Sequence, residues 1–284
     1  MQAGKWRYDS HLLELATGEL TDVCGVERVS HYNGVSFAPD GKKLLMTSLV
    51  EGTSKPFLMD LDGTNKTDVS GGTGGFTYGF NTSPDGKKIC FHEGYQVYIA
   101  NTDGSEKRKV ETGNRFNFVP VWSPDGKWIV FVSGEHYDCH PHVVRADATG
   151  LRKIADRGSY RGVTFFLDVF DFHQGSSDTP VWSADGNSIF YIAKVGDAIE
   201  LFQVTLDGTP KQLTRSRDGV SHYHPQPSKD GCHLLYGSKR DGVRQLFIRD
   251  LTNGTERQIT DLKKGHAAMW AKWQLAPDRS NTSE

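Results

Sequence analysis

Residues 119–132 read VPVWSPDGKWIVFV, and this stretch decides the fold class of the chain. A Pro-Asp-Gly turn signal separates two runs rich in β-branched and aromatic residues, which is the pattern of a β-hairpin. Its Ser-Pro-Asp-Gly core recurs in variants that end in an Asp-Gly pair and are spaced 45, 40, 60 and 45 residues apart, at Asp40, Asp85, Asp125, Asp185 and Asp230. A period on the order of 40 residues predicts the four-stranded blades of a β-propeller.

A second turn follows in each unit and completes the four strands. It lies at Asp62-Gly63, Asp103-Gly104, Thr149-Gly150, Asp207-Gly208 and Asn253-Gly254. We expect the Asp-Gly pairs to supply the positive φ angles of tight hairpin turns. Each unit is therefore predicted to be an antiparallel sheet of four consecutive strands.

The two ends of the chain are incomplete in complementary ways. Residues 11–20, HLLELATGEL, repeat the second hairpin without a preceding first hairpin. Residues 269–273, MWAKW, match a first strand and are followed by no full unit. We therefore expect a single all-β domain over residues 1–284, a six-bladed propeller whose last blade is built from both termini and leaves no free sheet edge.

Composition narrows the class of function. The chain has 33 Lys and Arg against 35 Asp and Glu, a net charge of −2, so it lacks the basic surface that binds nucleic acid. No stretch resembles a membrane span or the apolar part of a secretory signal. As given, the sequence indicates a cytoplasmic protein, or a periplasmic one if a signal peptide has been removed.

Histidine is concentrated on one predicted face of the ring. Because strand direction alternates, the two kinds of Asp-Gly turn share one face, and the other connections share the opposite face. Nine of the eleven histidines fall in or beside those other connections: His31, His92, His136, His140, His142, His173, His222, His224 and His266. This face is the predicted site of binding or catalysis.

Residues just before the innermost strands are expected to line the mouth of the central channel. They include Tyr32, Tyr78, Asp178 and Tyr223. His222 and His224 are two apart on an extended segment, so their rings are expected on the same side, where they could share a cation. The alternative is that each histidine hydrogen-bonds within its own blade, and His222 fits that structural role best.

The repeated Trp/Phe-Ser-Pro-Asp-Gly-Lys units resemble the propeller repeats of TolB and its relatives, over nearly the whole chain. Such blades occur in periplasmic binding proteins, in gating domains of peptidases and in polysaccharide lyases, so the resemblance is specific for fold and not for function. It leaves open a non-catalytic propeller that binds a protein, peptide or glycan.

Two histidine-rich stretches, HYHP at 222–225 and HYDCHPH at 136–142, resemble the oligogalacturonate lyases. The resemblance implies a divalent metal (Mn, Ca or Zn) in the channel that binds the carboxylate of an acidic oligosaccharide, and β-elimination at the neighbouring carbon. It implies His222 and His224 as metal ligands, His31, His173 or Asp178 as further candidates, and His136 or His140 as the base.

Basic residues on the same face would hold the substrate under this interpretation. They are Arg115, Arg161, Lys194, Lys239 and Arg240. Arg161 is also a candidate catalytic residue. The chain departs from the lyases at Gly219, where those enzymes have Gln, and in having one blade fewer. A metal-dependent lyase is the first hypothesis, and a TolB-like binding propeller with a protein partner is the second.

Overall fold

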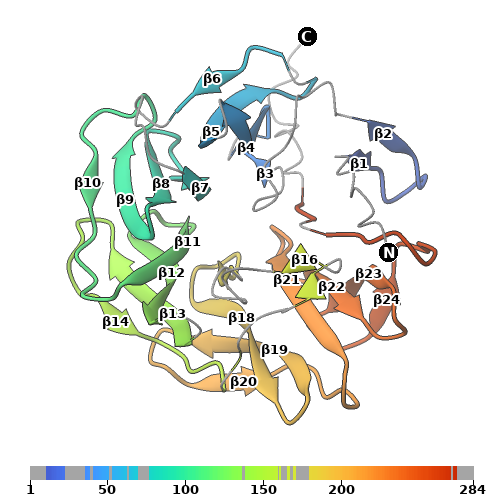
Figure 1. Ribbon diagram of the computed structural model, residues 1–284. Coiled ribbons are helices and arrows are strands. Elements are labelled where there is room, and N and C mark those ends of the chain that lie inside the picture. The colour runs from blue at the N-terminus through green and yellow to red at the C-terminus, as the bar shows by residue number, and fades with distance from the viewer. Residues whose placement is uncertain are drawn as a thin grey trace.

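The computed structural model describes residues 11–22, 36–38, 41–50, 53–62, 64–69, 77–135, 138–158, 160, 165–166, 169–170, 179–269 and 271–273. Across these residues the chain is all-β and has no helix. The strands form antiparallel sheets that stand around a common centre (Figure 1). This arrangement is consistent with the predicted β-propeller.

Five units of four strands follow one another along the chain. The first three are β3 (Ser36–Phe37), β4 (Lys43–Val50), β5 (Thr53–Asp60) and β6 (Thr67–Asp68); β7 (Thr77–Thr82), β8 (Lys88–Glu93), β9 (Gln96–Asn101) and β10 (Arg108–Lys109); and β11 (Phe116–Trp122), β12 (Trp128–Glu135), β13 (Asp138–Arg145) and β14 (Arg152–Lys153). The fourth comprises β17 (Val181–Trp182), β18 (Ser188–Val195), β19 (Ala198–Thr205) and β20 (Pro210–Gln212), and the fifth β21 (Ser221–Pro227), β22 (His233–Lys239), β23 (Arg244–Asp250) and β24 (Glu256–Gln258). The first strand of a unit lies towards the centre and the last at the rim (Figure 1).

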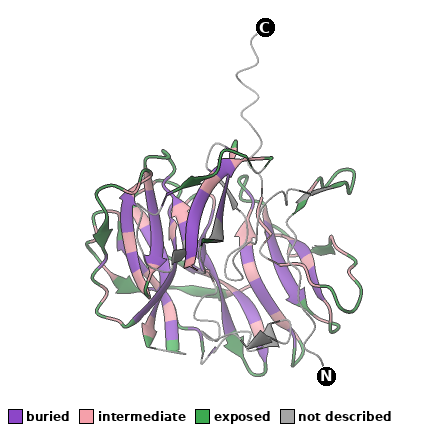
Figure 2. Cartoon of the chain, turned by 45° about the horizontal axis from the view of Figure 1, so that its top comes forward, coloured by how far each residue is buried: buried purple, intermediate pink, exposed green. Residues whose placement is uncertain are grey.

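Three shorter features complete the description. Strands β1 (His11–Leu13) and β2 (Leu20–Asp22) form a separate hairpin, as do β15 (Phe165–Phe166) and β16 (Val169–Phe170). One parallel pair, Ile199 with Ser221, joins the fourth unit to the fifth. The purple strands and green turns of Figure 2 show that the units bury their faces against one another and expose their turns.

The Ser-Pro-Asp-Gly turns work differently from the expected Asp-Gly hairpin. Only the glycine has a positive φ, 71° at Gly126, and the aspartate acts through its side chain. Asp125 accepts hydrogen bonds from the hydroxyl of Ser123 (2.6 Å) and the amide of Lys127 (3.0 Å), while the Ser123 hydroxyl accepts one from the amide of Trp128 (2.9 Å). The same contacts recur in the other described copies, so the motif is a side-chain-capped turn.

Three of the described innermost strands contain a β-bulge that the sequence pattern did not predict. The register breaks in β7, β11 and β21 at the same repeat position. Two of the residues in it, Val119 and His224, have positive φ angles of 47° and 49°, and each precedes a proline. A bulge inserts one residue into the strand, so the alternation of side chains across the strand is interrupted there.

Tryptophan links neighbouring units. Trp182, three residues before the motif Asp185, packs with Val130 and Val143 of the preceding unit, and its indole N–H donates to the carbonyl of Val121 (3.1 Å). Trp122, at the equivalent position, packs with the second unit. These clusters between units form the core.

The C-terminal segment approaches the fifth unit without an assigned strand at Met269 or residues 271–273. Ala267 forms a parallel bridge with Arg244, and the Trp273 indole donates to the carbonyl of Gln226 (2.9 Å).

Candidate functional site

His222 lies in a buried polar network between the fourth and fifth units. Its side chain is 1% exposed, and its Nε2 is 3.0 Å from the Ser216 hydroxyl and 3.6 Å from the Glu200 carboxylate. Glu200, on β19, also accepts hydrogen bonds from the hydroxyls of Thr214 (2.5 Å) and Ser216 (3.2 Å) and from the Ser216 amide. Burial lowers the pKa of His222 to about 4, with the charge of Arg240 acting in the same direction, so the imidazole is neutral at pH 7.

His224 has different neighbours. It occupies the bulge of β21, with its ring edge-on to Tyr223 at 5.4 Å between centroids. Desolvation, helped by the nearby charges of Lys272 and Arg244, lowers the pKa of His224 to about 3. Desolvation also lowers the pKa of Lys272 to about 8. This part of the fifth unit therefore brings a neutral imidazole close to two basic side chains.

The β-bulge at His224 interrupts the regular strand on which the pairing of His222 and His224 was predicted. His222 lies beside the hydroxyl of Ser216 and the ring of Tyr236, and the ring of His224 lies edge-on to that of Tyr223. Among the described residues, no group of three or more His, Cys, Asp or Glu side chains is arranged to hold a metal ion. The role of the two histidines as ligands stays a prediction.

His140 and His142 lie on strand β13, in the third unit, rather than in a long loop. Strands β12 and β13 pair up to Glu135 and Asp138, so only residues 136–137 connect them. His140 accepts a hydrogen bond from the amide of Arg157 at Nδ1 (3.2 Å), and its Nε2 lies 3.1 Å from the Asp138 carboxylate. Burial lowers the pKa of both histidines. His140 is therefore neutral at pH 7, and its hydrogen bond with Arg157 links β13 to the segment that follows β14.

Two of the predicted substrate-binding residues, Tyr223 and Arg240, make hydrogen bonds within the protein. Tyr223 is fully buried and donates to the carbonyl of Ala268 (2.9 Å). Arg240 donates to Tyr236 (2.5 Å) and Glu256 (2.7 Å).

The remaining predicted residues either have other neighbours or lie outside the described residues. Arg115 lies over the ring of Phe116, Lys194 is 4.0 Å from Asp197, Lys239 ends β22, and the backbone of Tyr78 pairs with His92. Six predictions lie outside the described residues: His31, Tyr32, His136, Arg161, His173 and Asp178.

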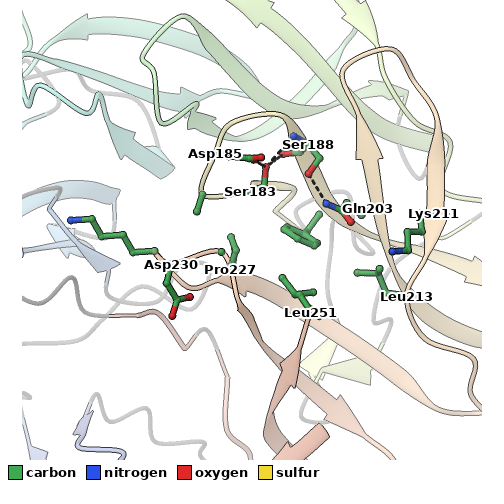
Figure 3. Close-up of a pocket in the computed structure, with 13 residues that line it drawn as sticks. Ser183, Asp185, Ser188, Gln203, Lys211, Leu213, Pro227, Asp230 and Leu251 are labelled. Atoms are coloured by element: carbon green, nitrogen blue, oxygen red, sulfur yellow. Dashed lines mark hydrogen bonds between the residues drawn. The ribbon is translucent and has the colours of Figure 1, made fainter. Parts of the chain in front are cut away.

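Sequence reasoning missed a cavity of about 560 Å³ between the fourth and fifth units. It lies on the turn face, opposite the one that the histidines had indicated. Its apolar lining includes Phe190, Leu213, Pro227 and Leu251 (Figure 3). The signal that could have found it is a departure from the repeat at two positions, Ala184 and Pro227.

Comparison with known proteins decides the family. The model of the TolB β-propeller domain matches residues 9–160, more than half of the chain. The chain belongs to the TolB β-propeller family. Its resemblance to TolB repeats is thereby confirmed.

Curated relatives of this TolB-type chain match over part of their length. A TolB homologue of Chlorobium luteolum is 32% identical over 162 residues, which is 57% of this chain and 33% of the homologue. An uncharacterized protein of Agrobacterium fabrum is 28% identical over 167 residues, or 57% of this chain and 54% of that protein. The chain thus spans from a third to about half of these relatives.

Solved structures agree on the fold. A putative TolB from Agrobacterium tumefaciens superposes with a TM-score of 0.72 at 19% identity, covering 91% of this chain and 90% of that one. An oligogalacturonate lyase in complex with manganese superposes with a TM-score of 0.56 at 18% identity, covering 88% of this chain and 72% of the lyase. At such identities the likeness concerns the fold alone. In the described part of this TolB-type chain, no helix is both long and apolar enough to span a bilayer.

Proposed function

We propose that this chain is a non-catalytic TolB-type propeller that binds a peptide segment of a partner protein. The observation that supports the proposal is that two of its histidines make contacts within the fold. His222 is held by Ser216 beside Glu200, and His140 accepts the Arg157 amide, so these rings maintain contacts between elements of the fold.

The energetics favour this interpretation over a metal site at His222. A metal at Nε2 would displace the Ser216 hydroxyl from a site that is 1% exposed, and Glu200 beside it is 2% exposed. Leaving a buried polar group without its partner costs about 1–3 kcal/mol. The same residues stabilise the interface between two units when no metal is bound, which gives them a structural purpose.

A peptide library displayed on phage and selected on the immobilised full chain tests the proposal. We expect a consensus peptide that binds one to one in calorimetry, with micromolar affinity. Absence of any saturable peptide binding would refute the partner-binding function.

A lyase remains the second candidate. Two observations favour it: the structural likeness to the manganese-bound oligogalacturonate lyase, and the group of neutral His224 with Lys272, whose lowered pKa of about 8 suits a base. Elimination creates an unsaturated uronate with a new ultraviolet absorbance. Incubating the protein with pectic, alginate, ulvan and glucuronan oligomers and manganese, calcium or zinc therefore tests it. A turnover that His224→Ala abolishes and His233→Ala retains would establish the lyase.

We also propose a single six-bladed domain over residues 1–284, closed by both ends. The support is a contact that repeats: the Trp273 indole donates to Gln226, four residues before Asp230, as the Trp182 indole donates to Val121, four before Asp125. Trp273 thus takes the place of an innermost-strand tryptophan in a sixth blade. Deleting residues 266–284 should cause aggregation or loss of cooperative unfolding, because it exposes a sheet edge.

A further inference from the structure

The interface between the fourth and fifth units lacks the tryptophan that fills two others. Trp122 and Trp182 stand three residues before the motif aspartate and pack against the preceding unit. In the fifth unit that position is Pro227, which also pairs in register with the second strand, as Trp122 and Trp182 do. A proline ring is smaller than an indole and carries no N–H. The interface is therefore missing apolar volume at this place.

A second substitution opens the same interface from the turn side. A Cβ placed on Gly126 would lie 3.6 Å from the ring of Pro84, and one on Gly186 would lie 3.5 Å from the ring of Pro124. In the next interface the facing residue is Ala184, whose Cβ is 3.8 Å from the corresponding point on Gly231. The proline ring that packs beside the turn in the earlier units is absent here.

Both Ala184 and Pro227 line the cavity of about 560 Å³, which is open to solvent and within the range of sites that hold a small organic group. Ser183, Asp185 and Ser188 line it from the fourth unit, and Pro227, Asp230 and Leu251 from the fifth (Figure 3). Below it lies the buried cluster that contains Phe190, against which Leu213 and Leu251 pack. Apolar side chains therefore line one part of the cavity, and the polar side chains of Ser183, Asp185 and Lys211 line another.

Hydrogen bonding at the rim of the cavity favours a neutral ligand that carries a hydrogen-bond donor. Asp185 is capped by Ser183 and Asn187, and Asp230 by Ser228 and Cys232. These hydrogen bonds lower the pKa of both carboxyls, so they stay charged and balance the charges of Lys211 and Lys229 at the same rim. The ligand need not carry a net charge.

The amide oxygen of Gln203 is an acceptor at the wall of the cavity. Gln203 donates its amide N–H to the Ser188 hydroxyl (2.7 Å), and its amide oxygen accepts no side-chain hydrogen bond among the described residues. An indole N–H is a donor only, and the indoles of Trp182 and Trp273 each donate to an oxygen of the preceding unit.

We propose that this cavity binds a tryptophan side chain of the partner peptide, which completes the interface in place of the tryptophan that the fifth unit lacks. The inference rests on the proposed function, because it assumes that the partner is a peptide, and it adds the site and the recognised side chain. The ring would lie over Phe190, Leu213 and Leu251, with its N–H directed to the Gln203 amide oxygen. Aromatic anchors in such pockets contribute much of the affinity of an interface.

Fluorine NMR on the full chain tests the site. The probe is a capped Gly-Ser peptide with one central 5-fluorotryptophan, compared with N-acetyl-tryptophanamide and with a peptide in which alanine replaces the tryptophan. We expect the fluorine signal to shift on binding, and intermolecular NOEs from the indole protons to the methyl groups of Leu213 and Leu251. The alanine peptide should not bind.

Two variants that restore the repeat should close the cavity. Pro227→Trp and Ala184→Pro should each weaken peptide binding about tenfold or more, or about 1.4 kcal/mol. Both introduce the residue that other units carry at the same place, so melting temperatures should be unchanged or higher. Pro84→Ala, in a turn whose interface retains Trp122, is the matched control and should leave binding unchanged.

The outcomes separate the two proposals. Tryptophan-peptide binding that Pro227→Trp does not weaken, together with NOEs to other residues, would overturn the site. A selected peptide without an aromatic residue that binds equally to the wild type and to Pro227→Trp would also overturn the site, while the partner-binding function stands. If no peptide binds at all, both proposals fail. If the free amide binds as tightly as the peptide, a small aromatic molecule replaces the partner's side chain as the ligand.

Discussion

Replacing Glu200 by alanine should destabilise the protein strongly, because Glu200 organises the network around His222. Its carboxylate is 2% exposed and accepts three hydrogen bonds, from the Thr214 hydroxyl and from the amide and hydroxyl of Ser216. Each buried donor left without an acceptor costs about 1–3 kcal/mol, and removing one member of a buried charged network costs about 3–5 kcal/mol. We expect a loss of about 3–5 kcal/mol in the free energy of unfolding, and a melting temperature about 10 °C lower.

Thermal and urea unfolding followed by circular dichroism measure this loss. Glu200→Gln keeps one acceptor oxygen and should fall between the wild type and Glu200→Ala. Glu111→Ala is the control, since that side chain is 79% exposed and, among the described residues, its ion pair is with Lys109, so it should change stability little. If Glu200→Ala melts within about 2 °C of the wild type, which corresponds to about 1 kcal/mol or less, the network does not hold the two units together and the reasoning fails.

Three further results are expected. The pKa of His222 is about 4 in the folded protein and about 6.5 in the unfolded chain, so the free energy of unfolding should be greatest above pH 6.5 and fall as the pH drops towards 4. In urea unfolding at pH 5 and pH 7, His222→Asn should reduce this pH dependence. A Cβ on Gly237 would lie 1.9 Å from the ring of buried Tyr223, so Gly237→Ala should lower the unfolding free energy by about 1–3 kcal/mol or more, and unchanged urea midpoints would contradict that packing. Trp273→Phe removes the hydrogen bond to Gln226 and should cost about 1 kcal/mol in calorimetry, whereas equal melting temperatures would count against the proposed closure.

The repeat allowed the fold to be predicted from the sequence. The Ser-Pro-Asp-Gly turns and the alternating strands around them predicted the four-stranded units, because both signals are local. The way in which the turn is stabilised could not be predicted from the sequence. Asp125 caps the turn through its carboxylate, and Gly126 alone takes the positive φ, so side-chain geometry decided what the dipeptide pattern left open.

The candidate site was harder to predict because it depends on contacts between units. Placing His222 and His224 on one side assumed a regular strand, and the bulge at His224 breaks that regularity. The loop predicted around His140 is a hairpin of two long strands. At the cavity, Ala184 stands where other units have proline, and Pro227 stands where two other units have tryptophan. Its lining comes from two units, so the cavity could be identified only from the packing of those units.

Manganese titration of histidine-labelled protein tests the central claim most directly. With 13C and 15N in the histidine rings, a bound Mn²⁺ ion broadens the signals of any ring that coordinates it. We predict that one equivalent of manganese leaves the His222 and His224 signals unbroadened, because His222 is buried in its network with Ser216 and Glu200 and His224 faces other neighbours. Selective broadening of both imidazole rings at one equivalent would contradict the account and establish a metal site at these two histidines.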